Sequence, residues 1–264
     1  MMEKQHQPKA NAPTPLNAGS TQQSPAEALA EQRLRELEEE RRQRDQFVSL
    51  VSHELRGPLA ALIGYAQLLA RADATAPDLR EKATQSILAQ SKRINQMVEN
   101  LLQASRLTSG RFRMERQPTN LLPLVRQVVA QQRDLAPHHH LVLHTPDVPI
   151  VGDWDANLLG LALANLLSNA VKFSPDGDEV DVSVQRTRSA ALVTITDRGI
   201  GIAPADLPTL FQPYRRPART ERYPGMGVGL YVAKGIVEAH GGQIGVDSQP
   251  ERGSTFWLTL PLPE

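Results

Sequence analysis

Residues 47–65 read FVSLVSHELRGPLAALIGY and form the centre of a long helical pattern. Apolar side chains recur within this stretch and on both sides of it, mostly at alternating steps of three and four residues, which is the spacing of a heptad seam. If Val48 is position a and Val51 is position d, His53 falls at position f, on the side away from the seam. The stretch therefore predicts an amphipathic helix with an exposed histidine next to the carboxylate of Glu54.

A second helical pattern follows the turn-like segment RADATAPD at residues 71–78, with its seam running from Ile87 to Ser105. Two long amphipathic helices joined by a short turn form a helical hairpin. Neither helix can close a core alone, so we expect hairpins from two chains to form a four-helix bundle in a homodimer. Periodicity alone fits a plain coiled-coil spacer equally well.

Gly57 and Pro58 are unusual in the middle of a helix. Pro58 has no N–H to donate to the carbonyl of Glu54, four residues earlier, and its ring crowds that carbonyl. We therefore expect the helix to bend near His53, which would provide a hinge for switching the bundle between states.

The composition changes twice along the chain. Residues 1–25 are rich in Pro, Gln, Asn, Ala and Ser, which predicts a disordered lead-in. Residues 26–109 then hold a charged signal helix and the hairpin. From residue 110 to 264 the pattern alternates between strands and helices, which predicts an α/β sandwich with helices on one face of a mixed sheet. The fold class is thus α + α/β.

Individual elements of this second half follow from period and turn signals. Helices are predicted over residues 121–136, 155–173 and 227–242, and strands over residues 140–146, 148–153, 178–188, 190–199, 243–248 and 254–261.

Bulk composition excludes several classes of protein. The 29 basic and 29 acidic residues cancel, which argues against a protein that coats nucleic acid or an anionic membrane. The absence of cysteine excludes thiol catalysis, disulfides and Cys-ligated metal. The longest nearly apolar run, at residues 59–70, is too short to span a bilayer, and the first residues lack the apolar core of a signal peptide. We expect no membrane segment in this chain, and a cytoplasmic protein or the cytoplasmic part of a longer receptor.

The segment NLLSNAVKF at residues 165–173 places Asn165, Asn169 and Lys172 on one helical face. Asparagine carbonyls are hard oxygen ligands suited to Mg²⁺, and lysine offers a point charge to phosphate. A solvated polar stripe is the ordinary interpretation of the same pattern.

Two glycine-rich segments follow, each of which is also typical of a simple turn. DRGIGIA, residues 197–203, ends a predicted strand, and its glycines allow the backbone to approach a ligand closely. GMGVGL, residues 225–230, leads into a helix, whose first N–H groups can bind an anion such as phosphate.

Taken together and in this order, the segments resemble those of the sensor histidine kinases of two-component signalling, over nearly all of residues 26–264. SHELRGPL resembles the phosphoacceptor box, NLLSNAVKF the N box, DRGIGIA the G1 box, LFQPYRR the F box, GMGVGL the G2 box and GSTFWLTLP the closing strand. Periodicity and composition permit this family, and the motif series identifies it.

The resemblance implies an ATP-dependent kinase that autophosphorylates His53 and passes the phosphoryl group to an aspartate of a response regulator receiver domain. Neutral His53 would be the nucleophile, and Glu54 would accept a hydrogen bond or a proton from its ring. Asn165 would hold Mg²⁺, and Asp197 would bind the adenine amino group. The remaining nucleotide residues implied by the family are Asn169 and Lys172 in the site, Gly199 and Gly201 around adenine, and Gly225, Gly227 and Gly229 at the lid, with either Arg215 or Arg216 reaching the γ-phosphate.

The chain departs from the family at two places. Gly57 stands where many relatives carry Thr or Asn, whose side chain orients water for removing phosphate from the partner, so the resemblance implies weak phosphatase activity. Gln212, Pro213 and Tyr214 replace the more usual acidic and Phe residues of the F box.

Two alternatives belong to other classes. Another GHKL-type ATPase, such as a chaperone or a DNA-repair ATPase, would lack the SHELR hairpin. A non-catalytic dimeric scaffold would not need complete nucleotide boxes.

Overall fold

The computed structural model describes residues 25–70, 77–110, 112–174, 179–217, 220, 223 and 225–263. Most of the predicted lead-in and most of the predicted turn at 71–78 lie outside the described residues. The chain divides into two compact units, Met1–Asp45 and Gln46–Glu264, and the second holds every site described below.

Two long helices form the predicted hairpin arms, α1 (Pro25–Ala70) and α2 (Pro77–Thr108). Helix α1 continues through Pro58 as one element, because a proline removes one hydrogen bond from a helix that has many others. The bend expected at this position stays a prediction. Among the described residues, no helix is long and apolar enough to cross a membrane.

Several apolar side chains of the hairpin are exposed in the single chain. They include residues on both helices: Leu59, Ile63, Leu88, Val98 and Leu102. Such a stripe on a helix pair is what a second hairpin would cover in a four-helix bundle.

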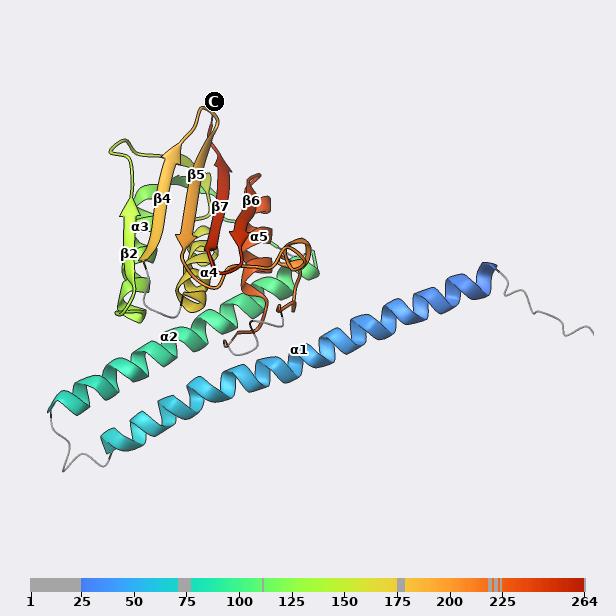
Figure 1. The fold of residues 1–264 in the computed structure, drawn as a ribbon, viewed down its shortest axis with the longest axis horizontal. Coiled ribbons are helices and arrows are strands. Elements are labelled where there is room, and N and C mark those ends of the chain that lie inside the picture. Colours follow the sequence, from blue (N-terminus) through green and yellow to red (C-terminus); the bar gives the residue numbers. More distant parts are fainter. Residues whose placement is uncertain are drawn as a thin grey trace, which may run out of the picture. The chain divides into compact units, whose positions relative to one another are not determined.

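The remainder of the chain folds around a five-stranded mixed sheet with the order β2-β4-β5-β7-β6 (Figure 1). Its strands are β2 (His140–His144), β4 (Glu179–Arg186), β5 (Ala190–Asp197), β6 (Gln243–Gln249) and β7 (Gly253–Pro261). Strands β2 and β4 are parallel, and the other neighbouring pairs are antiparallel. The predicted mixed sheet is therefore confirmed.

A separate two-stranded sheet pairs β1 (Gln117–Asn120) with β3 (Val151–Trp154). Strand β1 was not predicted, because its sequence QPTN has no apolar alternation and contains a proline. The predicted strand at 148–153 starts later than expected, at Val151.

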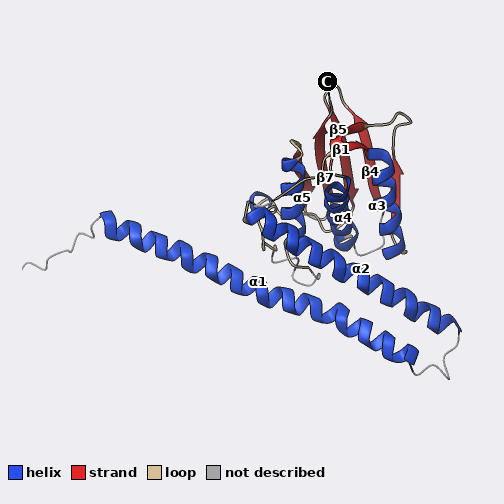
Figure 2. Ribbon diagram, turned by 180° about the vertical axis from the view of Figure 1, so that it is seen from behind, coloured by secondary structure: helices blue, strands red, loops and turns tan. Residues whose placement is uncertain are grey.

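Helices α3 (Leu121–Leu135), α4 (Ala156–Phe173) and α5 (Gly229–Ala239) cover one face of the large sheet (Figure 2). The alternation of β4 fits this arrangement, since Val180, Val182 and Val184 are buried while the residues between them are partly exposed. A short 3-10 helix, Leu207–Thr209, lies between β5 and α5.

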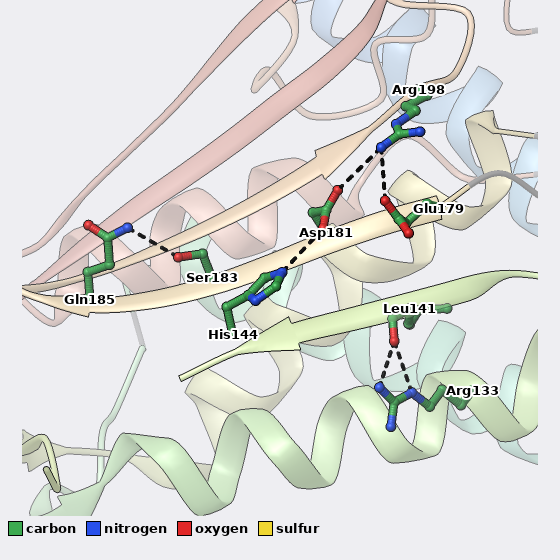
Figure 3. Close-up of polar contacts among 8 residues, drawn as sticks. All are labelled: Arg133, Leu141, His144, Glu179, Asp181, Ser183, Gln185 and Arg198. Carbon is green, nitrogen blue, oxygen red and sulfur yellow. Dashed lines mark hydrogen bonds and ion pairs between the residues drawn. The ribbon is translucent and has the colours of Figure 1, made fainter. Parts of the chain in front are cut away.

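The opposite face of the sheet carries polar and charged side chains (Figure 3). On this face Nη2 of Arg198 lies 2.9 Å from Oε1 of Glu179. Nε2 of His144 lies 3.5 Å from Oδ1 of Asp181. At the edge strand, Arg133 of α3 donates to the carbonyl of Leu141, which fixes α3 against β2 (Figure 3).

A buried histidine network fixes the start of α4, the helix that carries the predicted N box. The Asp155 side chain caps the helix by accepting from the N–H groups of Asn157 and Leu158, both at 3.0 Å. The N–H of Asp155 donates to Nε2 of His240, so Nδ1 of His240 carries the proton and donates to the carbonyl of Ile236. Burial lowers the pKa of His240, which keeps the ring neutral and able to accept.

Candidate nucleotide-binding site

A cavity of about 760 Å³ lies among α2, the C-terminal half of α4, the end of β5 and residues 215–230. It gathers most of the residues that the sequence predicted for nucleotide binding: Asn165, Asn169, Lys172, Asp197, Gly201, Arg215, Arg216, Gly225, Gly227 and Gly229. Three predicted residues, Gly199, His53 and Glu54, are not among its lining.

Asp197 closes one end of the cavity at the end of β5 and is only 4% exposed. Its Oδ1 accepts from the N–H groups of Gly199, at 2.9 Å, and Ser254, at 3.3 Å. Burial raises the pKa of Asp197, and these two N–H donors oppose that shift by stabilising the carboxylate. The group is thus a fixed, buried hydrogen-bond acceptor.

Gly199 contributes to this end through the backbone. A Cβ at Gly199 would lie 2.1 Å from the carbonyl oxygen of Phe173, so only glycine allows the turn to touch the end of α4. The N–H of Ile200 donates to that same carbonyl at 3.1 Å. Gly199 therefore supports the turn beside Asp197 from behind rather than lining the cavity.

Lys172 also lines the cavity, with its Nζ 4.2 Å from the centroid of the Phe173 ring. Its pKa is lowered to about 8, chiefly by burial and then by the positive charge of Arg216, with Glu54 acting in the opposite direction and Arg93 adding to the decrease. Cations collected in a partly buried cavity destabilise one another until an anion joins them. The part of the cavity around Lys172 is therefore suited to a polyanion.

The two ends of the lid segment between the F and G2 boxes meet through their backbone. Gly227 has φ of 69°, and a Cβ there would lie 2.9 Å from the carbonyl oxygen of Arg215. The carbonyl of Gly227 accepts from the N–H of Tyr214 at 3.0 Å. Arg216 donates to the carbonyls of Thr220 and Tyr223, so its guanidinium organises the described part of the lid.

Asn165 makes a contact that the sequence did not reveal. Its Nδ2 donates to Oδ1 of Asn100 at 2.7 Å, and its Oδ1 accepts from Nδ2 of Asn100 at 2.8 Å. Both amides are buried, with Asn165 5% and Asn100 7% exposed. Asn100 belongs to α2, and its only sequence signal was its place among several amide side chains of that helix, which resemble a solvated face.

The two residues predicted for the phosphoacceptor differ in their surroundings. His53 is exposed on α1, as the heptad position predicted, whereas Glu54 is 9% exposed. In the described part of the chain, Oε2 of Glu54 is buried without a hydrogen-bond partner, and no hydrogen bond joins it to His53. Consecutive helical residues point about 100° apart, which accounts for the difference.

Comparison with known proteins agrees with this architecture. Residues 43–110 match the family model of the His Kinase A (phospho-acceptor) domain, and residues 154–264 match that of the histidine kinase-, DNA gyrase B-, and HSP90-like ATPase. The sensor protein SrrB of Staphylococcus aureus is 32% identical over 221 residues, which are 83% of this chain and 38% of SrrB. The chain thus spans less than half the length of the curated relatives that it matches.

Solved structures show the same similarity. A mycobacterial sensor histidine kinase, MprB, is 29% identical with a TM-score of 0.50 and covers 57% of this chain and 100% of its own. The Acinetobacter baumannii histidine kinase AdeS is 25% identical with a TM-score of 0.55, covering 80% of this chain and 98% of its own. With a phospho-acceptor hairpin followed by an ATPase domain of this type, the chain belongs to the family of two-component sensor histidine kinases.

Proposed function

We propose that the chain is a protein-histidine kinase that uses ATP to phosphorylate its own His53 and then passes the phosphoryl group to an aspartate of a response regulator receiver domain. In this proposal residues 26–109 present the histidine and residues 110–264 bind ATP. The observation that carries it is that one cavity is lined both by a fixed carboxylate, Asp197, and by a group of cations around Lys172.

These two groups suit the two chemically different parts of ATP. The adenine amino group donates to Asp197, whose Oδ1 is already oriented by the N–H groups of Gly199 and Ser254. The triphosphate then reaches Lys172, and its negative charge raises the pKa of that amine above its value of about 8 in the free protein. Of the two lid arginines, Arg215 is the better candidate for the γ-phosphate, since Arg216 donates to lid carbonyls.

Asn165 fits a role as a Mg²⁺ ligand, because its side chain is a hard oxygen donor that lines the cavity close to Gly229. The described residues contain no cluster of three or more His, Asp or Glu side chains that could hold a metal ion. Asn165 would hold such an ion, which would supply charge neutralisation during phosphoryl transfer.

Phosphoryl transfer requires His53 to meet the γ-phosphate. A ring nitrogen of neutral His53 attacks the γ-phosphorus, the bond to the β–γ bridging oxygen breaks, and ADP leaves with that electron pair. The proton on the other ring nitrogen passes to Glu54 or to water. Because His53 does not line the cavity, the ATP-binding domain must reposition toward a histidine of its own chain or of a second chain.

A second copy of the chain is the expected partner for the hairpin, because exposed apolar residues such as Leu59, Ile63 and Leu102 need a cover. The homodimer therefore forms part of the proposal. Weak phosphatase activity forms another part, and it rests on Gly57, which has no side chain to orient water.

The decisive test is incubation of the full chain with γ-labelled ATP and Mg²⁺, beside His53→Gln. We expect a label on the protein that survives base, is lost in acid and is absent from His53→Gln, since phosphohistidine is a base-stable phosphoramidate. Addition of a cognate receiver domain should then move the label onto that protein.

Two other results would overturn the proposal. Nucleotide binding without any label would favour a non-catalytic scaffold, and steady ATP hydrolysis without a labelled protein would favour another GHKL-type ATPase. Glu54→Gln tests the role of the neighbouring carboxylate, because it should slow labelling of His53 without weakening ATP binding, since the change removes a negative charge that acts on Lys172.

A further inference from the structure

One face of α2 packs against the ATP-binding domain. Met97, Asn100, Ala104 and Leu107 follow one another at steps of three and four residues, so they lie on the same side of the helix. Met97, Asn100 and Ala104 are buried. A Cβ on Gly235 of α5 would lie only 2.5 Å from Cδ1 of Leu107, which shows how closely α2 approaches α5.

The reciprocal amide pair lies in the middle of this contact. Asn100 and Asn165 each donate one hydrogen bond and accept one, at 2.8 and 2.7 Å, so both side chains are oriented by the other. The carbonyl oxygen of Asn165 is the atom that would bind a cation, and it faces the donor N–H of Asn100. A metal ion and this N–H, both positive, compete for the same buried oxygen.

We infer that Asn100 is a positioning residue that withholds Asn165 from the metal while α2 is docked, so that the hairpin controls the metal-dependent part of ATP binding. This inference rests on the proposed function. Nucleotide without metal binds the docked state, whereas the metal–nucleotide complex binds fully only after the amide pair opens. Since α2 belongs to the same hairpin as α1 and His53, a change in hairpin packing reaches the metal ligand through one side chain.

The alternative is that the amide pair only stabilises the packing of α2 against α4. The two roles predict different effects on nucleotide affinity. A purely structural pair changes stability, or the affinity for all nucleotides alike. A pair that withholds a ligand lowers affinity only for the form of ATP that needs that ligand, by the fraction of molecules in which the pair is open.

The experiment measures the affinity of the full chain for ATP in Mg²⁺ and in EDTA, for wild type and Asn100→Ala. Alanine preserves α2, because it favours helix more than asparagine does. We expect Asn100→Ala to tighten binding in Mg²⁺ about tenfold, as the docked state loses two neutral hydrogen bonds, and to change binding in EDTA by less than about twofold.

Gln103→Ala is the matched control. Gln103 is also a buried amide of α2, three residues further along, but its Nε2 donates to Glu99 of its own helix at 2.6 Å. We expect this variant to leave the ratio of the two affinities at the wild-type value. If Asn100→Ala leaves that ratio unchanged as well, the inference is wrong. If wild type binds no ATP in either buffer, the proposed function is wrong, and the inference that rests on it is wrong as well.

A second measurement does not depend on a variant at the amide pair. The chain has no cysteine, so Ala104→Cys places a single thiol on the docked face of α2. We expect a thiol reagent to modify it several-fold faster with Mg²⁺ and ATP than with ATP in EDTA, because only the metal-bound complex releases α2. Equal rates in the two buffers would show that metal binding does not open the contact and would overturn the inference.

Discussion

The surroundings of Asp197 and of Lys172, the proposed adenine end and phosphate end of the cavity, are built differently. Asp197 is held by two backbone N–H groups, and Gly199 packs directly on the end of α4, so the acceptor is in place before any ligand arrives. Lys172 lies near other cations, and Asn165 is hydrogen-bonded to Asn100 of α2. The first group is complete in the free protein, whereas we propose that the second requires a polyanion and the release of α2.

This difference separates binding from chemistry. If adenine binds at Asp197, the preorganised acceptor keeps the entropic cost of binding low, because its groups do not have to be ordered. In the same proposal, the unfinished phosphate end makes the reaction depend on the state of the hairpin. Variants at the adenine end should therefore lower the affinity for all adenine nucleotides alike. Variants at the phosphate end should change only the part of the affinity that comes from the phosphates and the metal ion.

The largest effect is expected from Asp197→Asn. Its carbonyl oxygen can still accept from the N–H groups of Gly199 and Ser254, so the fold survives, but the new NH₂ group faces the adenine amino group as donor against donor. We expect the affinity for ATP to fall about 100-fold, because hydrogen bonds to charged groups contribute about 1.5–3 kcal/mol. Calorimetric titration with ATP and ADP measures this.

Both nucleotides should lose the same factor, and the melting temperature should remain close to that of wild type. A loss confined to ATP, or a loss of less than threefold, would show that Asp197 does not bind the base.

A second prediction concerns the start of α4, the helix whose C-terminal half lines the cavity. His240→Leu removes the acceptor for the buried N–H of Asp155 and should reduce the free energy of unfolding by about 2 kcal/mol, or about 30-fold in the equilibrium constant. His240→Gln offers an amide oxygen to the same N–H and should recover part of the loss. Denaturant titration of the three proteins tests both statements.

The same histidine gives a pH dependence with a definite sign. Because burial lowers the folded-state pKa of His240 below its ordinary value of 6.5, the unfolded chain takes up the proton first as the pH falls. Stability from this group is complete above about pH 6.5 and declines from there toward the lower folded-state pKa. If the free energy of unfolding of His240→Gln declines with falling pH as much as that of wild type, the effect comes from other groups.

A third, smaller effect tests the phosphate end directly. Lys172 has a pKa of about 8 in the free protein, and bound triphosphate should raise it, so binding above that pH requires proton uptake. ATP affinity should therefore fall about tenfold between pH 7 and pH 9, since linkage gives a slope of one decade per pH unit above the free pKa. Measured in Lys172→Arg, whose side chain stays charged, the same profile should be flat over this range.

The contrast between the two ends also explains how far the sequence could be read. Periodicity predicted the hairpin, the helices of the ATP-binding domain and the alternating burial of β4, because each depends on local spacing. The exposure of His53 followed from the same spacing and is confirmed. These features need no knowledge of which elements meet.

Contacts between distant residues were not predictable in this way. Asn100 and Asn165 are 65 positions apart, and neither helix carries a signal that they meet. The burial of Glu54 likewise depends on what packs beside α1, and β1 forms only because β3 offers it a partner. Each of these features arises from tertiary packing, which overrides local pattern.

The smallest effect is expected beside His53, where Gly57 lies one helical turn further along α1. Both residues are exposed, and a Cβ at Gly57 would have no atom within 4 Å, so Gly57→Thr can add a hydroxyl next to the phosphoacceptor without a clash. We expect the phosphoaspartate of the response regulator to be hydrolysed a few-fold faster, because a fixed hydroxyl orients the attacking water.

Gly57→Ala is the matched control, since it gains about 1 kcal/mol of helix propensity but no hydroxyl. If wild type and both variants release phosphate from the partner at one rate, the missing side chain at this position does not limit phosphatase activity. Equal gains in Ala and Thr would instead point to stiffening of α1 as the cause.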